Sequence, residues 1–173
     1  MYSFPSNFVR SELEAKVEKI QKIVEMLPNI QDPHTQFVLL RSCLALPKLS
    51  FILRTTDTSP FLDVLHHFDS LVREALSIIL GAALTDLQWK QASLPVSMGG
   101  LGLRGAEQHG PGFYCSSVLS SFRLSRTLQG IKEEGTTLTQ EVLSAVSASV
   151  GEEVTAEALS GLSQKALSLM ADE

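Results

Sequence analysis

Glycine residues between positions 99 and 105 match the letters of a phosphate-binding motif. Gly100, Gly102 and Gly105 stand in the order G-x-G-x-x-G. In dinucleotide-binding proteins, such glycines follow a buried strand and open a helix that holds the pyrophosphate. The preceding residues here, ASLPVSM, contain a proline and no apolar run. We therefore predict a structural turn at Gly99, Gly100 and Gly102, where glycine permits positive φ and close backbone packing.

Basic side chains at helical spacing are the second candidate for chemistry. Arg41, Lys48 and Arg54 follow one another at intervals of roughly two helical turns, and Arg104 comes directly after the glycine run. Lysine and arginine at such positions can contact a phosphate backbone. The alternative, which the sequence alone favours, is a solvated face with acidic partners. Three further residues could join the set in space, namely Arg73, Arg123 and Arg126.

Metal and thiol chemistry each have one weak candidate pair. Asp63 and His67 lie four residues apart, a spacing that could present two metal ligands on one helix face. Cys115 could pair with His109, although such catalytic pairs meet in space rather than in sequence. No further ligands are evident in the sequence, and no serine lies in a G-x-S-x-G motif. We therefore expect no catalytic residues, no metal and no small-molecule cofactor.

Charge is unevenly distributed along the 173 residues. Residues 1–132 contain 13 Lys and Arg against 11 Asp and Glu, while residues 133–173 contain 1 against 8. The body is thus nearly neutral and the last quarter acidic, so phosphate could be attracted only by local patches. We find no signal peptide and no apolar stretch long enough for a bilayer. The sequence predicts an intracellular protein, cytoplasmic or nuclear, without a membrane partner.

Apolar residues recur every three or four positions between residues 11 and 27, which predicts an amphipathic helix. Ser11 and Glu14 have capping-box spacing, which places the start of this helix at Ser11. The buried stripe should hold Leu13, Val17, Ile20 and Val24. We expect the stripe to pack inside the chain, with docking of a partner protein as the alternative.

Capping residues predict the remaining helices. Asp32-Pro33 should start a helix that Pro47 ends, and Ser59-Pro60 should start a central helix that ends at Gly81. Thr85 should cap a short helix, and Pro111 should open another that runs to about residue 130. Two further helices are expected at 137–149 and 155–171. The prediction is an all-α, orthogonally packed bundle of five to seven helices, with a main unit at 1–131, a glycine-rich elbow and an acidic helical appendage at 132–173.

Two segments in this order resemble a known protein family. LLRSCLALPKLSFILRT (39–55) and LQWKQASLPVSMGGLGLRGA (87–106) are similar to the region that follows the palm in reverse transcriptase-like proteins of non-LTR retroelements. The resemblance spans about residues 13–120 and is sharpest at 87–104. It implies a helical thumb or post-thumb element beside a template–primer duplex. It also implies backbone contacts by Arg41, Lys48, Arg54 and Arg104, and a structural turn at the three glycines.

The chain departs from this family where catalysis would occur. Polymerisation requires aspartates that hold two magnesium ions, and the family carries them in an aromatic-x-Asp-Asp motif. This sequence has no adjacent Asp-Asp pair. We therefore expect a non-catalytic module that binds a nucleic-acid duplex or gives structural support. The alternative is a repurposed module that binds another protein through an apolar helix stripe.

Overall fold

The computed structural model describes residues 6–128, and over this range the chain is helical without strands. Six α-helices are present in these residues, so the expected all-α class is confirmed. Their bounds are α1 Ser6–Val24, α2 Pro33–Leu39, α3 Leu46–Thr55, α4 Leu62–Leu80, α5 Asp86–Ser93 and α6 Ala106–Leu128. Short turns of tighter or wider helix lie between them: η1 Leu27–Asn29, η2 Leu40–Leu44, η3 Ser59–Phe61 and η4 Val96–Met98.

The chain divides into two compact units that are each discontinuous in sequence. Unit 1 comprises Met1–Ile52 and Pro60–Glu107, and unit 2 comprises Leu53–Ser59 and Gln108–Glu173. The expected boundary at residue 131 lies outside the described residues, as does the acidic segment 132–173. The candidate loop and most candidate side chains belong to unit 1.

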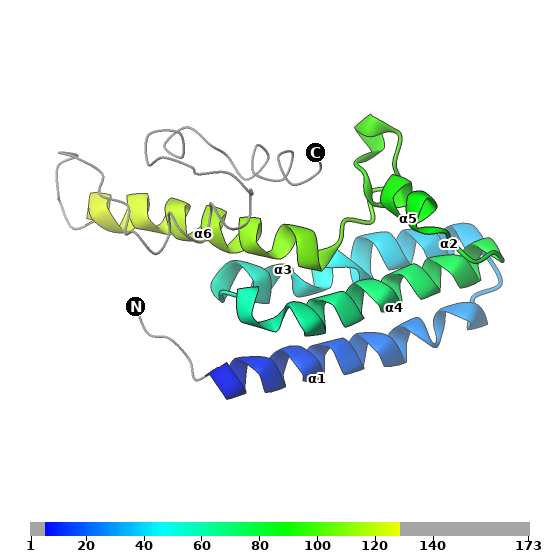
Figure 1. Cartoon of the computed structure of the whole chain (residues 1–173), viewed down its shortest axis with the longest axis horizontal. Coiled ribbons are helices and arrows are strands. Elements are labelled where there is room, and N and C mark those ends of the chain that lie inside the picture. The colour runs from blue at the N-terminus through cyan, green and yellow to red at the C-terminus, as the bar shows by residue number, and fades with distance from the viewer. Residues whose placement is uncertain (1–5, 129–173) are drawn as a thin grey trace. The chain divides into compact units, whose positions relative to one another are not determined.

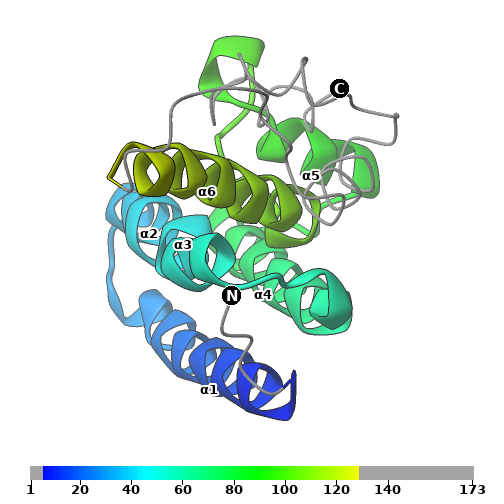
Figure 2. The same cartoon turned by 90° about the vertical axis from the view of Figure 1, so that its left-hand side faces the viewer.

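Unit 1 is built around α4. Helices α1 and α4 run side by side in the same direction, and α2 packs against α4 in the opposite direction (Figures 1 and 2). The turn η2 also contacts both α1 and α4. The facing surfaces are apolar and buried, with fully enclosed side chains that include Leu13, Leu40, Leu65 and Phe68. Burial of each such side chain contributes about 1.5–3 kcal/mol, so this interface makes a large contribution to the stability of the unit.

Helix α1 buries the stripe that its sequence predicts. Leu13, Val17 and Ile20 are at most 3% exposed, whereas Val24 is half-buried. Three of the four residues considered for a partner are therefore enclosed by this chain and have no surface to offer one. The predicted start of the helix is wrong, because α1 begins at Ser6 and already contains Ser11. Glu14 does not cap there, since it pairs with Arg10 one turn earlier at 2.9 Å.

The segment after α2 corrects the prediction for Pro47. Asp32 caps α2 as expected, because its carboxylate accepts hydrogen bonds from the backbone N–H of His34 and Thr35. The chain then widens into the π-turn η2, where Ala45 N donates to Leu40 O at 2.8 Å. Pro47 does not end a helix but lies in the first turn of α3. Proline is tolerated there because first-turn N–H groups have no helical acceptor.

Local capping signals are confirmed at the end of α4 and the start of α5. Gly81 ends α4 in the left-handed conformation with φ 67°, which glycine adopts without steric cost. Thr85 and Gln88 form a capping box at the start of α5. Helix α4 starts at Leu62, after the turn η3, and is less enclosed than expected for a central helix. Leu62 and Leu80 are both exposed.

Helix α6 begins at Ala106, five residues before the predicted start at Pro111. Pro111 therefore lies inside the helix rather than at its first position. The sequence around Ala106 contains no local capping residue, so the early start has a cause elsewhere in the chain.

One helical run in the described residues, Pro33–Thr55, is long and apolar enough to cross a membrane by length and composition. Its most apolar window has a mean hydropathy of 1.5, and 39% of that window is buried within the chain. The expectation that no stretch reaches this length is thus wrong for this run. Core helices meet the same criterion, and Leu40, Leu44 and Leu49 of this run are buried.

The buried stripe of α1 leads to a stability prediction. Leu13→Ala should lower the free energy of unfolding by about 2–5 kcal/mol, because it removes a fully enclosed side chain and leaves a cavity. Ile23→Ala on the same helix, where the side chain is 41% exposed, should cost much less. Urea unfolding followed by circular dichroism measures both. Equal losses would contradict the packing of the stripe inside the chain.

Candidate functional site

The glycine-rich loop, residues 94–105, is the centre of the candidate site. Gly99 and Gly102 have φ of 80° and 74°, in the left-handed region that favours glycine. Gly100 has ordinary dihedrals but no room for a side chain, since an added Cβ would lie 2.0 Å from Leu94 O. The three glycines thus serve two different needs, conformation at two positions and close approach at the third.

The backbone N–H groups of the loop are already used. Those of Met98, Gly99 and Gly100 donate to carbonyls of Pro95 and Val96, at 2.9–3.1 Å. Those of the next three residues donate to carbonyls of Ala92 and Leu94, at 2.8–3.3 Å. A phosphate cradle requires backbone N–H groups directed at the ligand. This loop has none to offer between Met98 and Leu103, so it does not resemble a dinucleotide site.

The two flanking leucines differ in their role. Leu103 is 1% exposed and anchors the end of the loop in the core. Leu101 is 37% exposed, so it does not anchor the loop as Leu103 does.

Arg41 lies against the loop. An added Cβ at Gly102 would come within 3.3 Å of Arg41 Nε, so the guanidinium covers this glycine. Arg41 and Lys48 are both exposed and neither forms an ion pair within residues 6–128. The structure therefore brings together Arg41, a predicted phosphate-binding residue, and Gly102, a predicted turn glycine, which are 61 residues apart in the sequence.

The remaining basic candidates do not all join this site. Arg104 lies two residues after Gly102 and is half-buried. Arg54 is exposed and belongs to unit 2, whereas the loop belongs to unit 1. The side chains of Arg123 and Arg126 lie outside the described ones. Of the seven basic residues, Arg41, Lys48, Arg73 and Arg104 belong to unit 1, and Arg41 lies against the loop.

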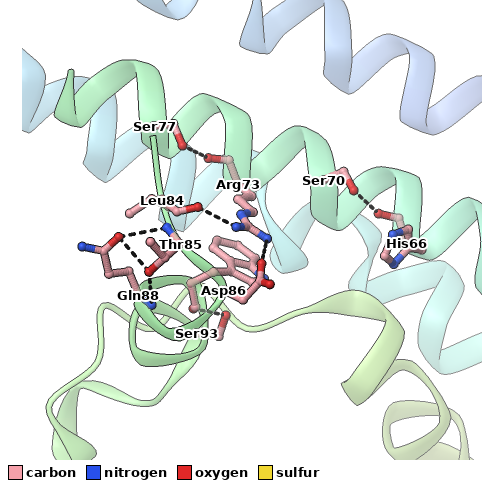
Figure 3. A network of polar contacts seen from close by, with 10 residues as sticks. His66, Ser70, Arg73, Ser77, Leu84, Thr85, Asp86, Gln88 and Ser93 are labelled. Atoms are coloured by element: carbon pink, nitrogen blue, oxygen red, sulfur yellow. Dashed lines mark hydrogen bonds and ion pairs between the residues drawn. The ribbon is translucent and has the colours of Figure 1, made fainter. Parts of the chain in front are cut away.

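Arg73 has a structural role instead (Figure 3). Its guanidinium donates to Leu84 O at 2.5 Å and pairs with Asp86 at 2.9 Å. These contacts hold the start of α5 to α4, beside the capping box of Thr85 and Gln88. Because the guanidinium of Arg73 is already paired within the chain, we do not count Arg73 among the candidate phosphate-binding residues.

Asp69 on α4 supplies the distant cause of the early start of α6. Its two carboxylate oxygens accept hydrogen bonds from Ala106 N at 2.7 Å and Glu107 N at 3.0 Å. An added Cβ at Gly105 would lie 3.0 Å from Asp69 Oδ2, so glycine leaves space for the carboxylate. Burial raises the pKa of Asp69 to about 6, against the opposing effect of the two backbone donors. Sequence reasoning missed Asp69, because nothing local connects it to a residue 37 positions away.

The metal and thiol candidates have ordinary roles. The Asp63 carboxylate is hydrogen-bonded by Arg10, which lowers its pKa. Asp63 and His67 line an open groove of about 600 Å³ along α1 and α4. No group of three potential metal ligands occurs in the described residues.

Cys115 and His109 are both buried, at 1% and 2% exposure. Burial raises the pKa of the Cys115 thiol to about 11, with a further contribution from Asp57. A catalytic thiol requires the opposite shift, since the thiolate is the nucleophile.

Several large apolar side chains are exposed near the glycine-rich loop. They lie on α5, on η4 and in the loop itself: Leu87 at 79%, Val96 at 57%, Met98 at 47% and Leu101 at 37%. Exposed apolar side chains of this size are a feature of protein–protein contact surfaces when they are contiguous.

Comparisons with protein-family models, curated proteins and solved structures gave no match.

The close approach at Gly100 can be tested by substitution. Gly100→Ala should destabilise the protein by at least about 1–3 kcal/mol, because the new methyl group overlaps a backbone carbonyl and the loop must shift. Gly112→Ala is the matched control, since its Cβ meets nothing within 4 Å in α6. That control should be neutral or stabilising by up to about 1 kcal/mol, because alanine favours helix. Denaturant midpoints decide between these expectations, and an unaffected Gly100→Ala protein contradicts the described loop.

The two cysteines should differ in reactivity. Cys43 is exposed and Cys115 is buried, and at pH 8 a thiol of pKa about 11 is ionised in only about one molecule in a thousand. A disulfide-exchange reagent should therefore modify one thiol quickly in the native protein and both after denaturation. Cys43→Ser should abolish the fast phase. Rapid modification of two thiols in the native protein would contradict this assignment.

Proposed function

We propose that the chain is a non-catalytic helical module, of the thumb or post-thumb type of reverse transcriptase-like proteins, that binds nucleic-acid backbone. The observation that carries this proposal is the position of Arg41. The exposed guanidinium of Arg41 lies against Gly102 of the glycine-rich loop. This loop belongs to the segment 87–104, where the resemblance is sharpest. Arg41 and Gly102 belong to the two segments that carry the resemblance, and the fold brings these segments together.

Charge supports phosphate as the ligand. Arg41 and Lys48 carry no acidic partner within the described range, so binding an anion breaks no ion pair of theirs. Contact with phosphate would release condensed counterions, and this release is the main source of affinity in sequence-independent binding. Because the loop N–H groups are occupied, the side chains supply the contacts. Such contacts fix position on a duplex and do not read its sequence.

The finer architecture belongs to the same proposal. In it, the helices form an orthogonally packed bundle, the glycine-rich loop acts as an elbow, and residues 132–173 form an acidic helical appendage. The protein acts inside the cell, in the cytoplasm or nucleus, without a membrane partner, metal or cofactor. Arg104 of unit 1 and Arg54 of unit 2 are the further basic residues that the resemblance assigns to backbone contact.

A second candidate is a protein-interaction module. The stripe of α1 no longer supports it, since Leu13, Val17 and Ile20 are buried. The exposed side chains of Leu87, Val96 and Met98 support it instead. In this version the glycine-rich loop and α5 carry apolar contacts to another protein, and Arg41 stabilises the loop.

Nucleic-acid binding across a salt series tests the first candidate. The full chain should bind a 20-base-pair duplex at about 50 mM salt and lose affinity steeply as salt rises. Arg41→Gln and Lys48→Gln should each weaken binding and reduce the slope of log affinity against log salt by about 0.9. Fluorescence anisotropy measures the affinity of each variant.

Lys19→Gln is the control, because it removes the same charge from the exposed face of α1. It should leave the slope unchanged. Absence of binding at about 50 mM salt, where phosphate contacts are strong, would remove this function. Equal effects of all three substitutions would mean that the chain responds to net charge rather than to a site.

A further inference from the structure

Asp69 on α4 binds the backbone at the start of α6, directly after the glycine-rich loop that forms part of the proposed phosphate-binding site. The segment from Gly102 to Glu107 is fixed on two sides. At its start, Gly102 N and Leu103 N donate to the backbone near α5, and Leu103 is buried. At its end, Ala106 N and Glu107 N donate to Asp69. Arg104 lies between these two attachments, and Arg41 covers the first of them.

We propose that Asp69 is a positioning residue for phosphate binding, whose ionised carboxylate holds the 102–107 segment so that Gly102 remains in place against Arg41. This inference rests on the proposed function and assigns a regulation to its site. A carboxylate accepts both hydrogen bonds fully because both oxygens carry negative charge. A protonated carboxyl group retains one good acceptor, so one of the two backbone attachments weakens when Asp69 binds a proton.

The charged groups around Asp69 define the pH dependence. Glu107, at the start of α6, raises the pKa of Asp69, and His66, one turn earlier on α4, lowers it. These two are themselves paired, with His66 Nδ1 and Glu107 Oε2 3.0 Å apart. Burial is the largest effect and sets the direction, so that Asp69 changes protonation at a pKa of about 6 rather than at the ordinary 3.8.

Protonation then has opposite effects on the loop and on the whole fold. The folded pKa lies above the unfolded one, so the folded protein gains stability from Asp69 as pH falls from above 6 towards 4. Over the same range the attachment of Ala106 and Glu107 becomes looser. Protonation of Asp69 should therefore raise the free energy of unfolding while it weakens the hydrogen bonds to Ala106 and Glu107. A residue whose protonation simply unfolds the protein would lower that free energy instead.

The local part is tested without nucleic acid. Two-dimensional NMR of the full chain should show the amide signals of Ala106 and Glu107 titrating with a midpoint near pH 6. Asp69→Asn, which keeps one acceptor and cannot change charge, should abolish this transition. His66→Gln should retain the transition, which separates the effect of Asp69 from that of the neighbouring imidazole. Titration that persists in Asp69→Asn overturns the proposal.

Binding of a 20-base-pair duplex at pH 7.5 tests the positioning role. Asp69→Asn removes a negative charge near a cationic face, so a purely electrostatic role predicts tighter binding. Positioning predicts the opposite, a loss of about three- to tenfold, comparable to one phosphate contact. Unchanged or tighter binding by a folded Asp69→Asn protein overturns the inference. Absence of binding by the unmodified protein as well would instead reject the proposed function.

If Asp69→Asn does not fold, the pH profile of the unmodified protein and of His66→Gln decides the matter. Falling pH adds positive charge on histidines and by itself tightens binding to phosphate. If Asp69 has a positioning role, the His66→Gln protein should lose affinity for the duplex as pH falls. The midpoint of this loss should lie near pH 6, as in the NMR transition. A continuous gain in affinity across this range contradicts it.

Discussion

The buried face of α4 is the constraint on which unit 1 depends. Val64, Leu65, Phe68, Val72 and Leu76 of this helix are enclosed, and α1, α2 and η2 all pack against it. Because this face fixes α4 in the core, its polar face becomes a rigid support. Three charged side chains on the polar face of α4 hold other helices through hydrogen bonds or ion pairs. Asp63 holds Arg10 of α1, Asp69 holds the start of α6, and Arg73 holds the start of α5.

The candidate site follows from these contacts rather than from any motif of its own. Arg73 and Asp69 fix the two ends of the segment that contains α5 and the glycine-rich loop, through contacts at Asp86 and Ala106. Between them the loop closes on itself through backbone hydrogen bonds. The glycines make this closure possible and leave the outer surface to side chains. The proposed phosphate contacts come from Arg41 and Lys48, which belong to η2 and α3.

The sequence predicted those parts of the fold that depend on neighbouring residues. Asp32, Gly81 and Thr85 cap helices as their local chemistry requires, and the stripe of α1 is buried as its spacing indicates. The errors have a common physical cause. Helix α6 starts early because Asp69, distant in sequence, supplies the cap that the local residues lack. Pro47 begins a helix because η2 has already interrupted the preceding one. At the site, the turn glycines could be anticipated from their spacing, while the contact of Arg41 with Gly102 required the fold.

The discontinuity of unit 1 has a consequence for synthesis of the chain. Helix α1 ends at Val24, but the partner face of α4 is complete only at Leu80. At about 5–20 residues per second, a ribosome needs roughly 3–11 s to make the intervening segment. During that interval Leu13, Val17 and Ile20 have no α4 to cover them. The nascent chain therefore exposes an apolar helix face that the finished protein hides, and a chaperone that binds such faces could hold α1 until α4 has been made.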